Sequence, residues 1–388
     1  MSHRRIASLL VLMFSGWFLS GCTGGTPVPS PSPAAAAAPT DSLERTIQHF
    51  VDDGATSVVV QVRWPAGEWS GSYGVRSLEG AQAARAQDRF SAGSVTKSMV
   101  AAEVMKLVDQ DLIELDHPVN EFLEAVEPAL HPPGPVTVRQ LLNHTSGMPD
   151  YLGPLHERLS VKEVAGTRLS MREGLHLAAN LPWESRNVGY FNYSNSNYLA
   201  LGLLIEKLRS KPLGDALKSD VFEPLGLDKT SLSEPDRTAG DNLHGYIVDG
   251  GRQLDVTQSE GLVGSPAGGV VSTTGDINDF YRALLSGKLL APASVEEMKK
   301  TGLGDYGLGL MRSGDGCSAG YRYGHGGIVY GYLTTSITSN DGGSQVTLAM
   351  ALPPLPASGN DATAERRVGL YASQMESAAQ ETLDRLCQ

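Results

Sequence analysis

Three kinds of motif are missing from this 388-residue sequence, and each absence excludes a class of protein. No basic block interrupts an acidic chain of net charge −12, so we expect no binding to nucleic acid. No His-x-His or His-Glu-x-x-His pattern occurs, so we predict no catalytic metal. No glycine-rich phosphate loop followed by Lys and Ser or Thr occurs either, and we expect no cofactor. The composition, 41% hydrophobic and 19% charged, suits a globular protein with a large core.

The first 40 residues do not read as part of the fold. A basic start is followed by an apolar run, Ile6–Leu19, that is too short to span a bilayer comfortably, and small residues then lead to Cys22. This order resembles a bacterial lipoprotein signal, in which residues 1–21 are removed and Cys22 is lipidated. An ordinary signal peptide is the alternative. Residues 22–40 are rich in Pro and Ala and predict a tether. We therefore expect an exported protein, held on the extracytoplasmic face of the membrane only by its lipid.

Two further cysteines, Cys317 and Cys387, remain if Cys22 carries lipid. Export implies an oxidising compartment, which favours one disulfide between them. By the loop-entropy model a bridge over so long a loop contributes roughly 4 kcal/mol. Two buried free thiols are the alternative.

Strand-like patterns lie at both ends of residues 41–388, and helical patterns lie between them. A helix is expected over 41–51 and another after residue 356. Strands are expected over 57–64, 69–77, 306–311, 321–327, 331–338 and 344–352. Because the late strands are joined by short turns, we predict an antiparallel sheet. The fold class is thus α/β (α+β): one sheet built from 41–93 and about 290–388, flanked by helices, with a mainly helical region over about 94–289.

A serine stands three residues ahead of a lysine where an apolar helical pattern begins, in "FSAGSVTKSMVAAEVMKL". Positions i and i+3 share one face of a helix, so Lys97 can reach the hydroxyl of Ser94. Serine is a weak nucleophile that needs a base beside it. A neutral lysine can be that base if burial lowers its pKa. A chance Ser-x-x-Lys is the alternative when this motif is taken alone.

Six ordered blocks set this motif in a wider pattern: "RFSAGSVTKSMVAA", "VTVRQLLNHTSGMPDY", "FNYSNSNYLALGLLIEKL", "VFEPLGLDKTSL", "SPAGGVVSTTGDINDFYRALL" and "YGHGGIVYGY". Together they resemble the serine β-lactamase and penicillin-binding-protein superfamily, over essentially all of residues 41–388. The branch is that of class C β-lactamases, D-alanyl-D-alanine carboxypeptidases, D-aminopeptidases and esterases. The resemblance implies that Ser94 is the acylated nucleophile and Lys97 its basic partner. The stretch 143–147, "NHTSG", reads as a helix stop and turn.

The family's second motif, Tyr-x-Asn, fits Tyr193 and Asn195, with Tyr190 as a competitor at the same spacing. By resemblance Tyr193 activates Ser94 or protonates the leaving group, and Asn195 hydrogen-bonds the substrate amide. A phenol ordinarily titrates near pH 10. For Tyr193 to act as a base, Lys97 would have to lower the pKa of Tyr193.

The third motif, His-x-Gly on a strand, fits His325 and Gly327. Glycine lets a substrate backbone lie against the strand edge. By resemblance, the backbone N–H groups of Ser94 and Ile328 form an oxyanion hole. His325 is expected to face the cleft and bind the carbonyl or carboxylate end of the substrate.

The sequence departs from parts of the family at this third motif. Class C β-lactamases typically have lysine where His325 stands, which makes β-lactam hydrolysis a less favoured main role. Carboxypeptidases often have threonine where Gly326 stands, which places recognition of a free carboxylate in doubt. We expect a serine hydrolase acting through an acyl-enzyme on a small peptide, ester or β-lactam, with peptidoglycan peptides as the favoured substrate. The leading activity is that of a D-alanyl-D-alanine carboxypeptidase or a related peptidase; a β-lactamase-like enzyme, an esterase and a non-catalytic sensor are the alternatives.

Overall fold

The computed structural model describes residues 40–232, 240–259, 264–302, 304–356 and 361–387. All of them belong to one compact unit, Ala38–Gln388. The predicted signal and lipidation site at Cys22 lie outside the described residues. Within the described ranges, no helix combines the length and apolarity needed to cross a membrane.

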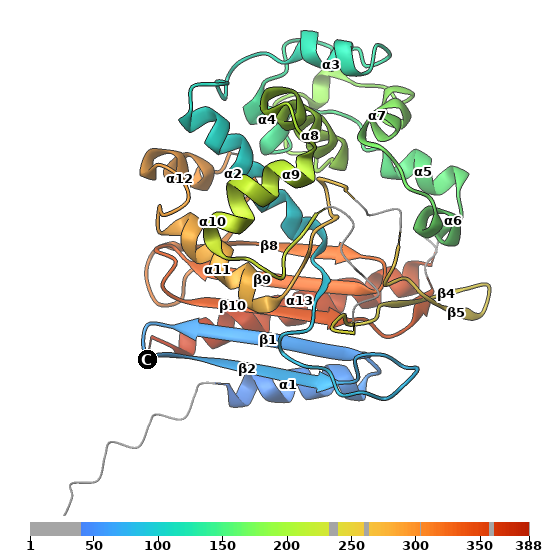
Figure 1. Cartoon of the computed structure of the whole chain (residues 1–388), viewed down its shortest axis with the longest axis vertical. Helices are drawn as coiled ribbons and strands as arrows, with labels where there is room; N and C mark the ends of the chain where they lie inside the picture. Colours follow the sequence, from blue (N-terminus) through green and yellow to red (C-terminus); the bar gives the residue numbers. More distant parts are fainter. Residues whose placement is uncertain (1–39, 233–239, 260–263, 303, 357–360, 388) are drawn as a thin grey trace, which may run out of the picture. The chain divides into compact units, whose positions relative to one another are not determined.

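A six-stranded antiparallel sheet is built from both ends of this unit, as predicted (Figure 1). The strand order is β2-β1-β10-β9-β8-β7. The first and last parts of the chain meet where β1 pairs with β10, with Ser57 opposite Ala351. The strands are β1 (Ser57–Trp64), β2 (Gly67–Gly74), β7 (Met311–Gly314), β8 (Tyr321–Val329), β9 (Tyr332–Ser339) and β10 (Gln345–Ala351).

The strand expected over 306–311 is wrong, because β7 begins only at Met311. The N–H of Gly307 donates to the carbonyl of Leu310, so this segment turns back on itself before the strand starts. The other three late strands lie within two residues of their predicted bounds.

Two helices cover one face of the sheet, α1 (Asp41–Asp52) and α13 (Ala362–Arg385). Alternation in β1 explains how they are held: Val58, Val60 and Val62 all point into the core beneath these helices, whereas Val59 belongs to the core on the other face. In α13 the buried positions follow a helical period and include Tyr371 and Met375.

The opposite face carries α11 (Thr274–Leu285) and, beyond it, the helical region (Figure 1). Two helices at its centre, α2 (Thr96–Asp109) and α8 (Asn195–Arg209), are buried on nearly all sides and form the interior of this region. Around them lie α3 (Asn120–Val126), α4 (Val138–Leu142), α5 (Leu152–Arg158), α6 (Val161–Gly166), α7 (Met171–Ala179), α9 (Leu213–Leu217), α10 (Glu223–Leu225), α12 (Pro292–Lys299) and the short turns η1 (Gly93–Val95), η2 (Ser185–Asn187) and η3 (Lys218–Phe222).

The inserted region also contains strands that the sequence analysis did not predict. A hairpin, β4 (Tyr246–Asp249) and β5 (Arg252–Asp255), is extended by β11 (Leu355–Pro356). Its two-residue turn, Gly250–Gly251, has φ of +55° and +77°. Paired glycines between two short strand-like runs, "YIVD" and "RQLD", are a hairpin signal that the sequence analysis missed. A second small ladder joins β3 (Phe90–Ser91) to β6 (Val271–Ser272) directly before Ser94.

A disulfide joins Cys317 to Cys387 and ties the end of α13 to the loop between β7 and β8. The guanidinium of Arg322, almost fully buried, forms ion pairs of 2.7 Å with Asp315 and with Asp384 beside the bridge. In the described part of the chain, Asp315, Cys317 and Asp384 are the one group spaced to bind a metal ion. The disulfide and the arginine already occupy these side chains.

Candidate active site

Ser94 lies in η1, where the chain passes from β3 into α2. Gly93 precedes it with φ of +56°, and a Cβ there would lie 3.0 Å from the backbone N of Ile328. Only glycine combines this backbone conformation with so close an approach. The glycine before Ser94 therefore allows this turn to lie directly against the backbone of β8.

The ammonium group of Lys97 reaches three acceptors around Ser94. Its Nζ lies 3.1 Å from the Oγ of Ser94, 2.8 Å from the Oδ1 of Asn195 and 2.6 Å from the carbonyl oxygen of Ala267. Burial lowers the pKa of Lys97 to about 7, against an opposing effect of the nearby Asp150 carboxylate. A large share of Lys97 is thus neutral near neutral pH and able to accept the proton of Ser94.

Tyr193 is the tyrosine of the second motif that reaches the serine. Its hydroxyl is hydrogen-bonded to Ser94, and the Nζ of Lys97 lies 4.9 Å from its ring centre. Tyr190, the competitor, is 63% exposed and lines neither of the cavities that reach Ser94. The structure therefore brings Tyr193, and not Tyr190, to the nucleophile.

The condition for Tyr193 to act as a base, a pKa lowered by Lys97, is not met. Burial raises the pKa of this phenol, and the hydrogen bond with Ser94 offsets only part of that rise. The ammonium lies over the ring rather than among the partners of the hydroxyl. Tyr193 consequently keeps its proton and is suited to donate it to a leaving group.

Asn195 is held by partners on both sides. Its Oδ1 accepts from Lys97, and its Nδ2 donates to the Oδ2 of Asp150 at 2.8 Å. The backbone N–H of Asn195 donates to the same carboxylate oxygen at 3.2 Å. Asn195 thus orients Lys97, and its contact with a substrate amide stays a prediction.

His325 lines the second cavity that reaches Ser94, and its ring is held by partners within the protein. The ring is 3% exposed, with its Nδ1 2.5 Å from the carbonyl oxygen of Gly326 and its Nε2 2.9 Å from the hydroxyl of Tyr306. A carbonyl only accepts, so Nδ1 carries the proton and Nε2 accepts from Tyr306. Burial and Lys97 lower the pKa of His325 to about 3. The ring therefore borders the cleft, as expected, but both of its nitrogens are engaged within the protein, and its contact with substrate stays a prediction.

The backbone of β8 approaches that of η1 closely at Gly327. A Cβ on Gly327 would lie 2.1 Å from the carbonyl oxygen of Ala92 and 3.2 Å from the backbone N of Ser94. The N of Ile328 lies beside Gly93 on the same contact. The backbone N atoms of Ser94 and Ile328 thus lie on the two sides of one close backbone contact, and the oxyanion hole that they would form stays a prediction.

His144 and Asp150 support the site and were not singled out from the sequence. The His144 ring lies 4.2 Å from that of Tyr193, centre to centre, at an interplanar angle of 32°. The backbone N–H of Ser194 donates a hydrogen bond of 3.2 Å to the Nδ1 of His144, and this bond fixes the segment that carries Tyr193. Both residues belong to the block "VTVRQLLNHTSGMPDY", so the block itself was the available signal. The stretch 143–147 is therefore more than a helix stop.

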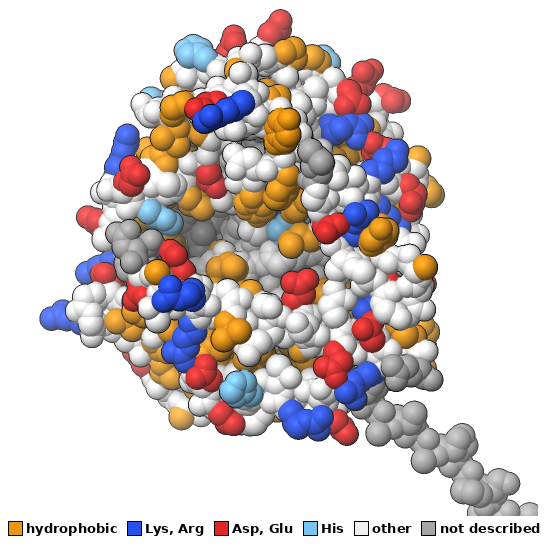
Figure 2. All heavy atoms as spheres, turned by 180° about the vertical axis from the view of Figure 1, so that it is seen from behind, with side chains coloured by type: hydrophobic (Ala, Val, Ile, Leu, Met, Phe, Trp, Pro, Cys, Tyr) orange, Lys and Arg blue, Asp and Glu red, His pale blue; other side chains and the backbone are white. Residues whose placement is uncertain are grey.

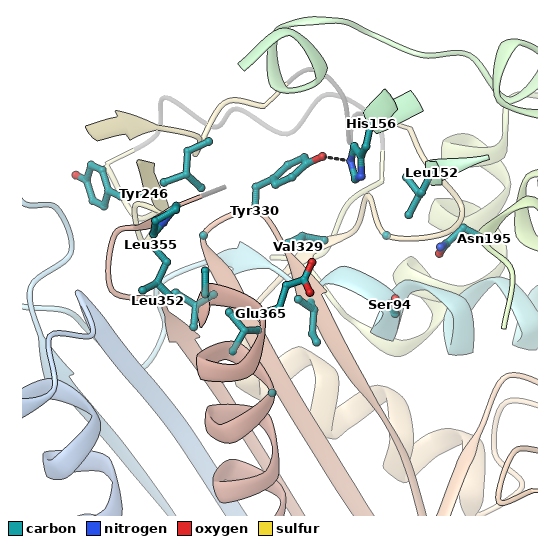
Figure 3. Close-up of a pocket in the computed structure, with 18 of the residues that line it drawn as sticks. Ser94, Leu152, His156, Asn195, Tyr246, Val329, Tyr330, Leu352, Leu355 and Glu365 are labelled. Atoms are coloured by element: carbon teal, nitrogen blue, oxygen red, sulfur yellow. Dashed lines mark hydrogen bonds between the residues drawn. The ribbon is translucent and has the colours of Figure 1, made fainter. Parts of the chain in front are cut away.

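Two cavities meet at Ser94, in the hollow between the helical region and the sheet (Figure 2). The first, of about 530 Å³, extends past Val329 towards β4, β11 and the start of α13 (Figure 3). The second, of about 470 Å³, is lined by Tyr193 and follows β8 past His325. Ile328 and Asn195 border both cavities.

A buried lysine beside a serine and a phenol hydrogen-bonded to that serine are the arrangement of a serine hydrolase site. The beta-lactamase family matches residues 43–370, and this chain belongs to that family. The predicted superfamily, fold class and enzyme class are thereby confirmed.

Two curated relatives and one solved structure illustrate the range of the family. Penicillin-binding protein 4* of Bacillus subtilis is 26% identical over 69% of this chain and 61% of its own length. Esterase EstB of Burkholderia gladioli is 30% identical over 43% of this chain and 44% of its own. The D-stereospecific amidohydrolase of Streptomyces sp. is 26% identical, with a TM-score of 0.71 over 87% of this chain and 97% of that one. This chain thus spans less than two thirds of the length of these two curated relatives.

Proposed function

We propose that this protein hydrolyses amide or ester bonds of small peptides through an acyl-enzyme formed on Ser94. The observation that carries the proposal is the 3.1 Å contact between the Oγ of Ser94 and the Nζ of a buried Lys97 whose pKa lies at about 7. Neutral Lys97 takes the proton of Ser94 while Oγ bonds to the carbonyl carbon. The N–H groups of Ser94 and Ile328 stabilise the oxyanion.

The second half of the cycle uses the phenol. As the bond to the leaving nitrogen or oxygen breaks, Tyr193 gives it a proton and recovers one from Lys97. Water then attacks the acyl-enzyme and gives one proton to neutral Lys97. As the bond between the carbonyl carbon and the Oγ of Ser94 breaks, Lys97 returns that proton to Oγ and the acid is released. The first leaving group has carried off the original proton of Ser94 and the water replaces it, so no co-reactant is needed.

Among peptide substrates, we propose a peptidase or amidase related to the D-alanyl-D-alanine carboxypeptidases rather than a strict carboxypeptidase. Gly326 has no hydroxyl to bind a terminal carboxylate, and both nitrogens of His325 are occupied within the protein. Recognition of the acyl side is then the main source of specificity. The esterase among the relatives favours ester hydrolysis as the second candidate.

Covalent labelling tests the nucleophile. The soluble domain is incubated with a fluorophosphonate or a fluorescent penicillin, and the mass of the intact protein is measured. We expect one adduct on the wild type and none on Ser94→Ala. An adduct that persists on Ser94→Ala would reject Ser94, and a wild type without adduct or turnover would favour a non-catalytic sensor.

We further propose that the protein is exported and attached to a membrane through lipid on Cys22, which would bring its site close to peptidoglycan peptides. The support is the order of basic, apolar and small residues before Cys22 and the Pro- and Ala-rich stretch behind it. In cells, the Cys22→Ser variant should appear in the soluble fraction while the wild type sediments with membranes. A variant that still sediments would contradict the anchor.

A further inference from the structure

The first cavity is the place where substrate selection is built into this chain. It opens directly at Ser94 and is lined mostly by apolar side chains, among them Ile247, Val329, Leu352 and Leu355 (Figure 3). Its volume of about 530 Å³ falls within the range of small-molecule sites. An apolar wall of this size favours a bulky hydrophobic group next to the scissile bond.

The position of Tyr193 decides which half of a substrate enters this cavity. A leaving group must face the phenol that protonates it, and Tyr193 lines only the second cavity. The leaving group therefore lies along β8 in the second cavity. The acyl group, which stays bonded to Ser94, lies in the first.

One acidic side chain projects into the first cavity. Figure 3 shows the carboxylate of Glu365, from the first turn of α13, beside Val329 and on the side of Ser94. Among the described residues no ion pair or side-chain hydrogen bond engages this carboxylate. Asp150, whose charge acts on Lys97, lines neither cavity and is engaged by Asn195. Glu365 is thus the acidic group that an acyl group can meet.

Resting on the proposed function, we propose that the acyl half of the substrate is an amino acid with a free amino group and a bulky apolar side chain. The ammonium pairs with Glu365, and the side chain fills the apolar part of the first cavity. The substrates are then amino-acid amides and esters and peptides with a free amino terminus.

Two substrates that differ only in the charge of the amino group test the pairing with Glu365. Phenylalanine p-nitroanilide and its N-acetyl derivative are compared, with the D and L enantiomers assayed separately. We expect the free amine to be preferred, and Glu365→Gln to lower its kcat/KM by about 10- to 100-fold, the range for a charge-assisted hydrogen bond. The N-acetyl substrate should be hydrolysed equally by both proteins.

Glu124→Gln is the control. Glu124 is an exposed glutamate of α3, it lines neither of the two cavities, and its substitution changes the net charge equally. This variant should keep the preference for the free amine. Equal losses in both variants, or no loss in Glu365→Gln, would overturn the pairing with Glu365.

A second variant tests the apolar part without touching the charge. Gly369 lies one turn after Glu365 and lines the same cavity, and a Cβ there meets nothing within 4 Å. Gly369→Phe should narrow the cavity without clashing with the backbone. It should lower kcat/KM for phenylalanine p-nitroanilide at least about tenfold more than for the alanine analogue, a difference of roughly one pocket-filling group. Equal effects on the two substrates would overturn the assignment of the acyl side chain.

Fluorophosphonate labelling of each variant separates this inference from the proposed function. Labelled protein that shows no preference for free amines overturns the inference and leaves the proposed function standing. Wild-type protein that takes no label and turns over no substrate overturns both.

Discussion

Burial keeps part of Lys97 neutral, so that it can accept the proton of Ser94, a role that a histidine has in other serine hydrolases. The side chain is fully buried, and the charge of Asp150 opposes the effect of burial on its pKa. In the described part of the chain Asp150 makes no ion pair with Lys97 and accepts from Asn195 instead. Desolvation disfavours the charged ammonium, which lowers the pKa of Lys97 to about 7. The lysine is thereby a usable base near neutral pH without any histidine.

This predicts the pH dependence of the reaction. Since Lys97 must be neutral to accept a proton, kcat/KM for an uncharged ester should rise about tenfold per pH unit below its pKa of about 7 and level off above it. The buried phenol of Tyr193, with its raised pKa, should keep the plateau flat to well above pH 8. A steady-state pH profile measures this, and a rate that falls as the pH rises through 7 would contradict it.

Tyr193 is predicted to act by proton transfer, and its removal should slow the chemistry. Tyr193→Phe should lower kcat by about 10²- to 10⁴-fold, because no other hydroxyl is bonded to Ser94 in the described residues. The exposed neighbour gives the control: Tyr190→Phe should leave kcat unchanged. Steady-state kinetics with one ester substrate decide between them, and the reverse outcome would transfer the role to Tyr190.

At the scale of elements, the site depends on the backbone contact between β8 and η1. This contact exists because Gly327 faces Ala92 without a side chain between them. The neighbouring glycine is different, since a Cβ on Gly326 would meet only the carbonyl oxygen of Thr334, at 3.9 Å. The two glycines therefore make a matched pair.

Gly327→Ala should push β8 away from Ser94 and disturb the oxyanion hole. We expect a loss of kcat of about 10²- to 10³-fold, the effect of losing one oxyanion donor. Gly326→Ala should retain most of the activity, since its added methyl group has room. Kinetics together with circular dichroism distinguish a local change from unfolding. Similar losses in both variants would show that this contact does not govern the oxyanion hole.

At the scale of the whole molecule, the last helix of the chain covers the sheet and is tied to it by the disulfide. The Cys317–Cys387 bridge spans 70 residues and holds the end of α13 beside the sheet, where Arg322 pairs with two aspartates. The start of the same helix lines the first cavity. One helix therefore connects the disulfide to the proposed acyl site.

Removing this bridge should cost stability and leave the chemistry intact. A Cys317→Ser, Cys387→Ser double variant should lose roughly 4 kcal/mol by the loop-entropy model and melt at least about 5 °C lower. Ser94 should still be labelled at low temperature. Thermal melts with and without reductant provide the check. Reductant should lower the melting temperature of the wild type to that of the variant and leave the melting temperature of the variant unchanged. A wild type that ignores the reductant would contradict a stabilising bridge.

The sequence alone predicted which residue types would perform the chemistry, and it determined most of the segments that form the six-stranded sheet. Ser94 and Lys97 share a helix face by their spacing, and the alternation in β1 and the periodicity of α13 follow from local pattern. These features are local, so a single chain segment is enough to reveal them.

Only the tertiary structure decided the state and direction of the side chains. It buried Lys97, kept the proton on Tyr193, engaged both ring nitrogens of His325 within the protein and placed Glu365 in the cavity that opens at Ser94. The reason is physical: a pKa depends on desolvation, and a cavity depends on which distant segments pack together. Neither quantity belongs to any one stretch of sequence.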